Sequence, residues 1–263
     1  IFKELVKRGY SLRGRTRVWN IADSKLWYLT PDQAQGYLDL EKSSEYQKDV
    51  NKVGENLVES NIKQIMNFVE KGPLNIVDLG CGDGGKACQV MDHLRENNKL
   101  RYCPIDISSH MVTKAIETVS KMKDVHEIIE SNYNISDFEN LDNVTPLLTK
   151  GEYKRNLFLL LGNTLGNFEV NEMLYQIYSG MNKGDLLLVG TGVDDFNGDA
   201  RAIAYKTNKM WHDWLGGVVF QLGLSDEDVV IDSRFVNTRI EMFYVLKRDK
   251  PVEFLDKKVD FKK

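Results

Sequence analysis

The sequence predicts an α/β fold built on a doubly wound, mostly parallel sheet of seven strands. Short apolar runs of the kind that form buried strands alternate with longer segments in which apolar residues recur at helical spacing. Such alternation is typical of a parallel sheet whose two faces are covered by helices. A glycine-rich turn directly after the first of these strands, at 80–85, supports the same fold class.

The expected elements start with a helix at 53–69, which ends before Gly72 and Pro73. The clearest later helix covers 170–181, where apolar residues recur at i, i+3, i+4, i+7 and i+8. The expected strands are 74–79, 102–107, 125–129, 157–161 and 186–189. The other expected helices are 87–94, 109–122 and 198–214. Two further β-like runs follow at 227–236 and 239–246. The predicted organisation is a Rossmann-like core over residues 55–191, with an accessory substrate lid formed by residues 1–54 and 192–263.

Composition and charge exclude several classes of protein. Hydrophobic side chains make up 42% of the 263 residues, which is enough for a core and too much for a disordered chain. No apolar run approaches the roughly 20 residues that span a bilayer, which argues against an integral membrane protein. A net charge of −4 makes a nucleic-acid partner an unfavoured expectation. Three cysteines without a C-x-x-C pair predict neither disulfides nor a metal site, and favour a cytoplasmic location.

The beginning of the chain departs from this acidic composition. The first 17 residues hold six basic side chains and one acidic side chain, Glu4. Two interpretations stay open: a solvated arm, or a tail that contacts RNA or a membrane.

The most informative motif is the turn after the first strand, Val77-Asp-Leu-Gly-Cys-Gly-Asp-Gly-Gly85. Gly80 and Gly82 have no side chains, so the backbone can lie against a ligand at the start of the next helix. Asp106 follows Gly82 by 24 residues, where the second strand is expected to end. An acid at that place can accept hydrogen bonds from both hydroxyls of a ribose. Together the two features predict an adenosine-type cofactor.

Three ligand assignments for this turn stay open. Gly80, Gly82 and Gly85 satisfy the G-x-G-x-x-G pattern of dinucleotide sites. Against a dinucleotide, Asp83 would place a carboxylate in the loop that holds a pyrophosphate, where like charges repel. Asp78 suits a cationic ligand such as S-adenosylmethionine, which carries a sulfonium and an ammonium but no phosphate. The string from Asp78 to Gly82 resembles the first motif of class I S-adenosylmethionine-dependent methyltransferases; a turn that binds no ligand is the third assignment.

A second string, Gly162-Asn-Thr-Leu-Gly-Asn-Phe168, follows the fourth strand. It lacks the prolines of enzymes that methylate exocyclic base nitrogens, which counts against that class. It resembles the signature of the histidine-specific methyltransferase family, whose members include enzymes that trimethylate the α-amine of histidine on the way to ergothioneine. The resemblance to this family extends over roughly residues 25–245. Further segments that resemble the family's motifs follow in the same order, at 25–28, 45–46, Lys86, 102–108, 184–191, 204–205 and 238–242.

The family resemblance implies methyl transfer from S-adenosylmethionine to the α-amine of an amino acid, with S-adenosylhomocysteine as the product. The implied cofactor-binding residues are Asp78, Gly80, Cys81, Gly82, Lys86, Asp106, Ile107, Asn132, Tyr133 and Gly162, with Asp137 and Phe138 as competitors of Asn132 and Tyr133 for the adenine. The implied substrate-binding residues are Tyr28, Tyr46, Asn167, Tyr205, Glu241 and Phe243, of which Asn167, Tyr46 and Tyr205 are the catalytic candidates. Phe243 replaces a small hydroxyl residue of the histidine enzymes, so an amino acid with a more apolar side chain, or another small amine, fits equally well.

Alternatives remain at the level of both residues and function. Asn167 could instead cap the helix that begins near Val170, and Glu241 could be an ordinary solvent-facing residue of a strand. The enzyme could methylate another small molecule or a protein amine. A protein that binds the cofactor without catalysis, or in association with RNA, is the alternative from a different functional class.

Overall fold

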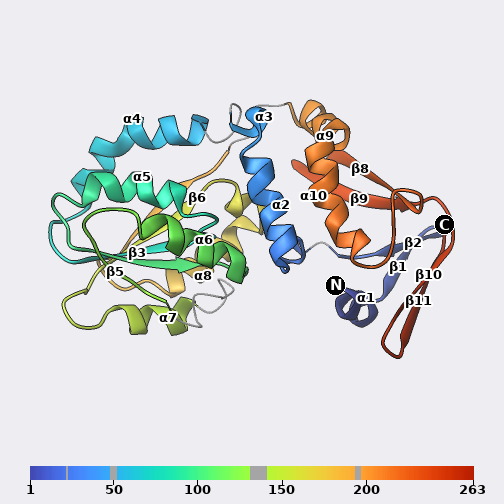
Figure 1. Cartoon of the computed structure of the whole chain (residues 1–263), viewed down its shortest axis with the longest axis horizontal. Helices are drawn as coiled ribbons and strands as arrows, with labels where there is room; N and C mark the ends of the chain where they lie inside the picture. The colour runs from blue at the N-terminus through green and yellow to red at the C-terminus, as the bar shows by residue number, and fades with distance from the viewer. Residues whose placement is uncertain (22, 48–51, 131–140, 193–196) are drawn as a thin grey trace. The chain divides into compact units, whose positions relative to one another are not determined.

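The computed structural model describes residues 1–21, 23–47, 52–130, 141–192 and 197–263. The chain divides into two compact units (Figure 1). One unit, Glu41–Gly192, contains the parallel sheet, and we call it the sheet unit. The other consists of two separate segments, Ile1–Leu40 and Val193–Lys263, and we call it the split unit.

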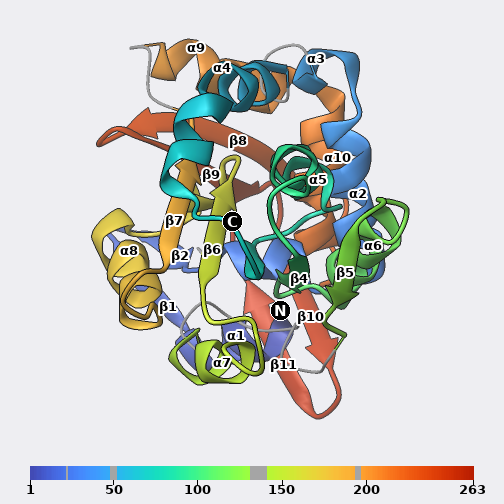
Figure 2. The ribbon, with the colours of Figure 1, turned by 90° about the vertical axis from the view of Figure 1, so that its left-hand side faces the viewer.

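The sheet unit is built on five parallel strands in the order β5-β4-β3-β6-β7. These strands are β3 (Leu74–Leu79), β4 (Leu100–Ile105), β5 (Val125–Ile128), β6 (Asn156–Leu161) and β7 (Leu186–Gly190). The chain moves outward from β3 through β4 to β5 and then returns to the other side of β3, where β6 and β7 lie side by side (Figure 2). The order therefore reverses between β3 and β6, and the carboxyl ends of strands at such a reversal are where α/β folds bind ligands.

Helices cover both faces of this sheet, which confirms the predicted doubly wound α/β class. They are α4 (Lys52–Phe68), α5 (Gly85–Leu94) and α6 (Ser109–Val119) on one face, and α7 (Leu141–Leu148) and α8 (Val170–Ser179) on the other. Figure 1 shows α4 and α5 on the side of the sheet opposite α7. Neighbouring residues of one strand, such as Ile76 and Val77, belong to different cores. Burial on both faces explains why the strands are continuous apolar runs in the sequence.

The sheet has five strands in the described residues, not the expected seven. The two β-like runs near the end of the chain form β8 (Val229–Val236) and β9 (Arg239–Leu246), which pair with each other in the split unit. The two residues between them, Asn237 and Thr238, have φ values of 51° and 62°. A two-residue turn with positive φ at both positions matches the twist of an isolated antiparallel hairpin. The turn therefore favours pairing of these strands with each other.

The split unit also contains several short elements. They are α1 (Phe2–Arg8), β1 (Tyr10–Arg13), β2 (Thr16–Trp19), η1 (Ser24–Trp27), most of α2 (Pro31–Glu41), α9 (Gly198–Thr207), α10 (Lys209–Phe220), β10 (Lys250–Phe254) and β11 (Lys257–Phe261). The single helix expected at 198–214 is wrong, because the chain breaks at Asn208. Asn208 has extended backbone angles, and its side chain accepts hydrogen bonds from the N–H groups of Met210 and Trp211. It is the N-cap of a new helix.

Side chains from both ends of the sequence share the core of the split unit. Phe2 and Leu5 of α1 are buried in one cluster with Val252, Val259 and Phe261 of the β10–β11 hairpin. The interpretation of the first 17 residues as a solvated arm is therefore wrong, since part of this segment packs into a folded core.

Glycine is required where α5 packs against α6, which gives a first testable prediction. Gly84 has φ 78°, and a Cβ placed there would lie 3.0 Å from the Cα of Ala115. We expect Gly84→Ala to lower the free energy of unfolding by about 2–4 kcal/mol, from left-handed strain and overpacking together. Gly54→Ala is the control, because Gly54 lies in α4 with no atom within 4 Å of the added Cβ. That control should instead stabilise by up to about 1 kcal/mol, and equal effects of both variants in chemical denaturation would contradict the prediction.

Candidate functional site

The glycine turn joins β3 to α5 at the carboxyl edge of the sheet. Gly80 and Gly82 have φ values of 67° and 53°, which side chains rarely adopt. A Cβ on Gly80 would also lie 3.0 Å from the Oγ1 of Thr164. The N–H of Gly80 donates to the carbonyl of Ile105 at the end of β4, with an N···O distance of 2.8 Å. This bond holds the turn against the strand that presents Asp106.

Asp106 lies directly after β4, one residue beyond the strand's end, and is buried. Its carboxylate accepts a hydrogen bond from the N–H of Ser108 at 2.9 Å and a longer one from the N–H of Gly82 at 3.5 Å. Burial raises its pKa to about 6, although these backbone donors act in the opposite direction. Ile107 follows and is half-buried. The structure thus brings the predicted ribose acceptor to the glycine turn, and its role stays a prediction.

Asp78, the fifth residue of β3, is a second buried carboxylate at this edge. Burial raises its pKa to about 7, opposed mainly by a hydrogen bond from Tyr102 and then by the positive charge of Lys86. A buried carboxylate is stabilised by a cationic partner, because removal from water penalises an isolated charge. The site is therefore suited to a ligand that carries an ammonium group.

Lys86 is held over the end of β6. Its Nζ lies 3.3 Å from the Oε1 of Glu41, whose side chain is 12% exposed. A Cβ on Gly162 would lie 3.4 Å from the same Nζ, so glycine at this position leaves room for the ammonium. Sequence reasoning missed Glu41, because nothing in its spacing or composition marks it as a partner of a residue 45 positions away.

Asp83 occupies the start of α5. Its Oδ1 accepts a hydrogen bond from the N–H of Gly85 at 3.0 Å. This N–H belongs to the helix terminus that would bind a pyrophosphate in a dinucleotide site. A carboxylate already fills that place, which supports the interpretation of the turn as a site for a ligand without phosphate.

The cysteines of the sheet unit are buried or half-buried thiols. The side chain of Cys81 packs in the hydrophobic core beneath the turn, so the backbone of this residue, rather than its thiol, can contact a ligand. Burial raises the pKa of Cys103 to about 12 and that of Cys81 above its usual range. Among the described residues, no group of His, Cys, Asp and Glu side chains has an arrangement that could hold a metal ion. Within the same residues, no helix is both long and apolar enough to cross a bilayer.

Asn167 and Tyr46 are the predicted substrate residues of the sheet unit. Asn167 ends the short helix η5 (Thr164–Asn167) and is exposed. It does not cap α8: the side chain of Glu169 does so by accepting hydrogen bonds from two backbone N–H groups at 3.0 and 3.1 Å. Tyr46 ends the short helix α3 (Ser44–Tyr46) and is buried.

Tyr28 and Tyr205 belong to the split unit, where a cluster of aromatic rings connects them. The Tyr28 ring lies 5.6 Å from Trp214, and the Tyr205 ring lies 4.1 Å from Trp211. The two tryptophans are themselves in contact at 5.7 Å. Tyr37 completes the cluster beside Tyr28, at 5.3 Å. Burial raises the pKa of Tyr205, so its phenol stays neutral.

Glu241 and Phe243 lie on β9 and share one partner. The Glu241 carboxylate pairs with Arg234 on the adjacent strand at 2.7 Å. The guanidinium of Arg234 also lies over the Phe243 ring, 5.2 Å from its centroid. The structure thus brings these two predicted residues together around a cation. Of the remaining predicted residues, Asn132 and Tyr133 lie outside the described residues, as do Asp137 and Phe138.

Tyr102 is a residue of this site that sequence reasoning did not single out. It is fully buried in β4, and its hydroxyl donates to the Oδ2 of Asp78 at 2.7 Å. In the parallel register Tyr102 lies opposite Ile76, so it is a diagonal neighbour of Asp78 on the same face. The available signal was a hydroxyl-bearing side chain in a buried strand, two positions before Pro104, which is the residue paired with Asp78.

This contact gives a second prediction. Tyr102→Phe removes a hydrogen bond that favours ionised Asp78, so the carboxyl pKa should rise further above 7. If ionised Asp78 binds the ammonium of the cofactor, affinity falls as the pH drops through this pKa, and the fall should begin at a higher pH in the variant. Calorimetric titration of S-adenosylhomocysteine between slightly acidic and alkaline pH measures the shift. Tyr153→Phe, a buried tyrosine away from Asp78, is the control; identical pH profiles for Tyr102→Phe and wild type would refute the role.

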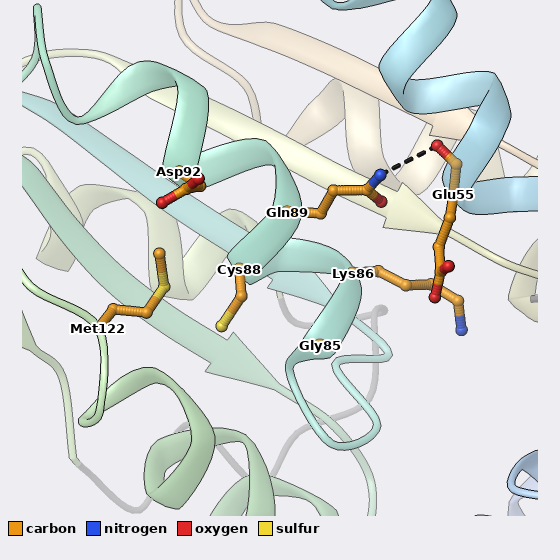
Figure 3. A pocket seen from close by; sticks show the side chains of 7 residues that line it. All are labelled: Glu55, Gly85, Lys86, Cys88, Gln89, Asp92 and Met122. Atoms are coloured by element: carbon orange, nitrogen blue, oxygen red, sulfur yellow. Dashed lines mark hydrogen bonds between the residues drawn. The ribbon is translucent and has the colours of Figure 1, made fainter. Parts of the chain in front are cut away.

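A hollow of about 500 Å3 lies beside this site, on α4 and α5 (Figure 3). Its lining consists of Glu55, Gly85, Lys86, Cys88, Gln89, Asp92 and Met122. It shares Gly85 and Lys86 with the glycine turn, but neither Asp78 nor Asp106 lines it. Burial raises the pKa of Cys88 to about 11, so this thiol is protonated at neutral pH. The hollow is a neighbour of the candidate site and not part of it.

The chain is similar to one protein family and to several solved structures. The family model described as histidine-specific methyltransferase, SAM-dependent, matches residues 50–212. No curated protein matches the sequence. One similar solved structure is the CurJ carbon methyltransferase, with 18% identity and a TM-score of 0.44, where the match covers 72% of this chain and 46% of that chain. Another is a candidate S-adenosylmethionine-dependent methyltransferase from Methanococcus maripaludis, with 14% identity and a TM-score of 0.42, where the match covers 90% of this chain and 99% of that chain. A third is a phosphoethanolamine N-methyltransferase from Haemonchus contortus in complex with phosphomonomethylethanolamine and S-adenosylhomocysteine, with 13% identity and a TM-score of 0.35, where the match covers 75% of this chain and 46% of that chain.

The family match covers more than half of the chain and includes the glycine turn, Asp106 and the string from Gly162 to Phe168. The protein is therefore an enzyme that uses S-adenosylmethionine to transfer methyl groups. The chain belongs to the family of histidine-specific, S-adenosylmethionine-dependent methyltransferases.

Proposed function

We propose that this enzyme methylates the amine of an amino acid or a closely related small molecule. The observation that carries the proposal is the side chain of Asn167. It is exposed, lies just beyond the strand that leads to Gly162, and has no hydrogen-bond partner among the described residues. A free amide at this place can accept a hydrogen bond from an amine and donate one to a carboxylate.

The residues at the glycine turn fit S-adenosylmethionine. Asp78 would hold the ammonium of its amino-acid part, Asp106 would accept hydrogen bonds from the ribose hydroxyls, and Lys86 would attract the carboxylate. Glycine at 80 and 82 leaves the backbone open to the ligand. When bound, the cofactor supplies a methyl group on a positively charged sulfur, which is a good leaving group.

The protein's own contribution is to orient the acceptor. An amine has to be unprotonated to attack, and a nearby carboxylate would favour its protonated form. Amide and phenol groups avoid this effect, and the side chains of Asn167 and Tyr46 in the sheet unit are of these kinds. The proton of the amine passes to water. Correct placement of the reacting atoms supplies most of the acceleration in such a displacement.

The contacts of Glu241 and Phe243 bear on the substrate's side chain. The carboxylate of Glu241 is already paired with Arg234, and the same guanidinium covers the ring of Phe243. A histidine ring would have to compete with Arg234 for Glu241, whereas an apolar side chain would not. These contacts favour an amino acid with a more apolar side chain than histidine.

A binding screen tests the proposal. S-adenosylhomocysteine is first titrated by calorimetry, and the standard amino acids are then compared by thermal shift with that product present. The expected result is a shift with one or a few amino acids, lost in Asn167→Ala and kept in Asn171→Ala, whose exposed side chain lies on α8. Binding of S-adenosylhomocysteine with no response to any amino acid, and no methylated amino acid in a turnover assay, would contradict the proposed substrate class.

A further inference from the structure

The first 19 residues have a charge opposite to that of the rest of the chain. They contain six basic residues and one acidic residue, a net charge of +5, while the other 244 residues contain 29 basic and 38 acidic residues, a net charge of −9. None of these residues is among the cofactor or substrate residues proposed above. The net negative charge of the whole chain made a nucleic-acid partner an unfavoured expectation. This net value averages over a separate segment that is strongly cationic.

This segment is folded. It forms α1 and the β1–β2 hairpin, in which Tyr10 pairs with Trp19 and Leu12 with Arg17. The Trp19 ring contacts Phe261 at 5.4 Å, and Phe2 contacts Phe254 at 5.7 Å, so the segment packs on the β10–β11 hairpin of the same unit (Figure 1). The basic side chains are thus fixed to a structured base.

Five of the six cations of the segment are exposed and form no ion pair with a described residue, whereas Arg8 pairs with Glu4 and Asp23. Lys3, Lys7, Arg13, Arg15 and Arg17 are all exposed, and none forms a salt bridge with another described residue. In the rest of the chain, five arginines bond to carboxylates: Arg95, Arg101, Arg155, Arg234 and Arg248. The charge of Arg17 contributes to lowering the pKa of Asp249, but guanidinium groups without an ion pair on one hairpin still repel one another, so an anionic partner would stabilise them.

Aromatic surface accompanies the charge. The ring of Tyr10 is 46% exposed, and the guanidinium of Arg17 lies over it at 4.8 Å from the centroid. Guanidinium groups bind phosphates through two parallel hydrogen bonds, and an exposed aromatic ring can stack on a base. We propose that α1 and the β1–β2 hairpin bind single-stranded nucleic acid, with Arg13, Arg15 and Arg17 on the phosphates and Tyr10 against a base.

A lipid surface fits these residues less well. Insertion into the headgroup region needs adjacent apolar side chains, and Leu12 is a single exposed aliphatic residue among the arginines. The neighbouring β10–β11 turn does expose Phe254 and Leu255. However, charges of both signs surround that turn, with Glu253 and Asp256 beside Lys257 and Lys258, so it has no net attraction for anionic lipids.

Fluorescence anisotropy with labelled oligouridylate and oligothymidylate over a series of salt concentrations tests the proposal. For three phosphate contacts on a single strand, the logarithm of the binding constant should fall with the logarithm of salt concentration with a slope of about −2. The triple variant R13Q/R15Q/R17Q should bind at least about tenfold more weakly at low salt and lose most of this slope. RNA and DNA probes in parallel show which sugar is preferred.

The control variant is K63Q/K121Q/K123Q, which removes the same charge from exposed lysines of the sheet unit. It should bind the oligonucleotides as wild type does. Both triple variants are checked for an unchanged affinity for S-adenosylhomocysteine and an unchanged melting temperature. Absence of binding by wild type, equal losses in the two variants, or binding to vesicles of anionic phospholipid without binding to either oligonucleotide would each overturn the proposal.

Discussion

Asn167→Ala is expected to lower kcat by about a hundredfold or more, because misplacement of a reacting group has effects of this size in displacement reactions. Its affinity for S-adenosylhomocysteine should stay at the wild-type value, since the proposed cofactor contacts lie on the glycine turn and on Asp106. The side chain is exposed and does not cap α8, so its loss should not unfold the protein. Single-turnover kinetics with the amino acid from the binding screen measures the effect on the chemical step.

Asn171→Ala is the control for this prediction. Asn171 is another exposed asparagine, four residues away in α8, and it should keep wild-type turnover. A parallel loss of cofactor binding and turnover in Asn167→Ala would show that Asn167 supports the cofactor site and would remove its role in orienting the amine.

Asp106→Ala has the second large expected effect, on the binding of cofactor. Hydrogen bonds to a charged group contribute about 1.5–3 kcal/mol each, so the loss of two ribose contacts should raise the Kd by about a hundredfold or more. Folding should survive, because burial already penalises the ionised form of this carboxyl and raises its pKa to about 6. Calorimetric titration of S-adenosylhomocysteine above pH 7 is the measurement, since the carboxylate is then ionised.

Two further variants bracket the interpretation of Asp106. Asp106→Asn keeps one acceptor oxygen and should bind with intermediate affinity. Asp92→Ala removes a carboxylate from the exposed side of α5, where it pairs with Arg95 at 2.9 Å, and should bind like wild type. If Asp106→Ala binds like Asp92→Ala, the ribose does not contact Asp106.

The sheet unit was predictable because its signals are local. Burial of both faces makes β3 and β6 continuous apolar runs, and the apolar spacing from Val170 shows α8 directly. The split unit was less predictable. Its helices are short, an asparagine cap at Asn208 divides one expected helix into two, and the β8–β9 pairing depends on turn geometry at Asn237 and Thr238.

The candidate site divides in the same way. The glycine turn and Asp106 were found because their spacing is tied to one ligand geometry, and they meet in the structure at the ends of β3 and β4. Tyr102 and Glu41 were missed, because each acts on a predicted residue through a contact that depends on strand register or on tertiary packing. Spacing in one sequence does not encode such contacts.

The carboxylate of Asp83 at the start of α5 has a consequence for the enzyme inside a cell. Many abundant metabolites share adenine and ribose with the methyl donor but also carry phosphate groups. An anion fixed on the Gly85 N–H repels these metabolites from the one helix terminus that would otherwise attract them. Nucleotide cofactors should therefore be poor competitors, so that methylation follows the supply of donor and is insensitive to the energy charge of the cell.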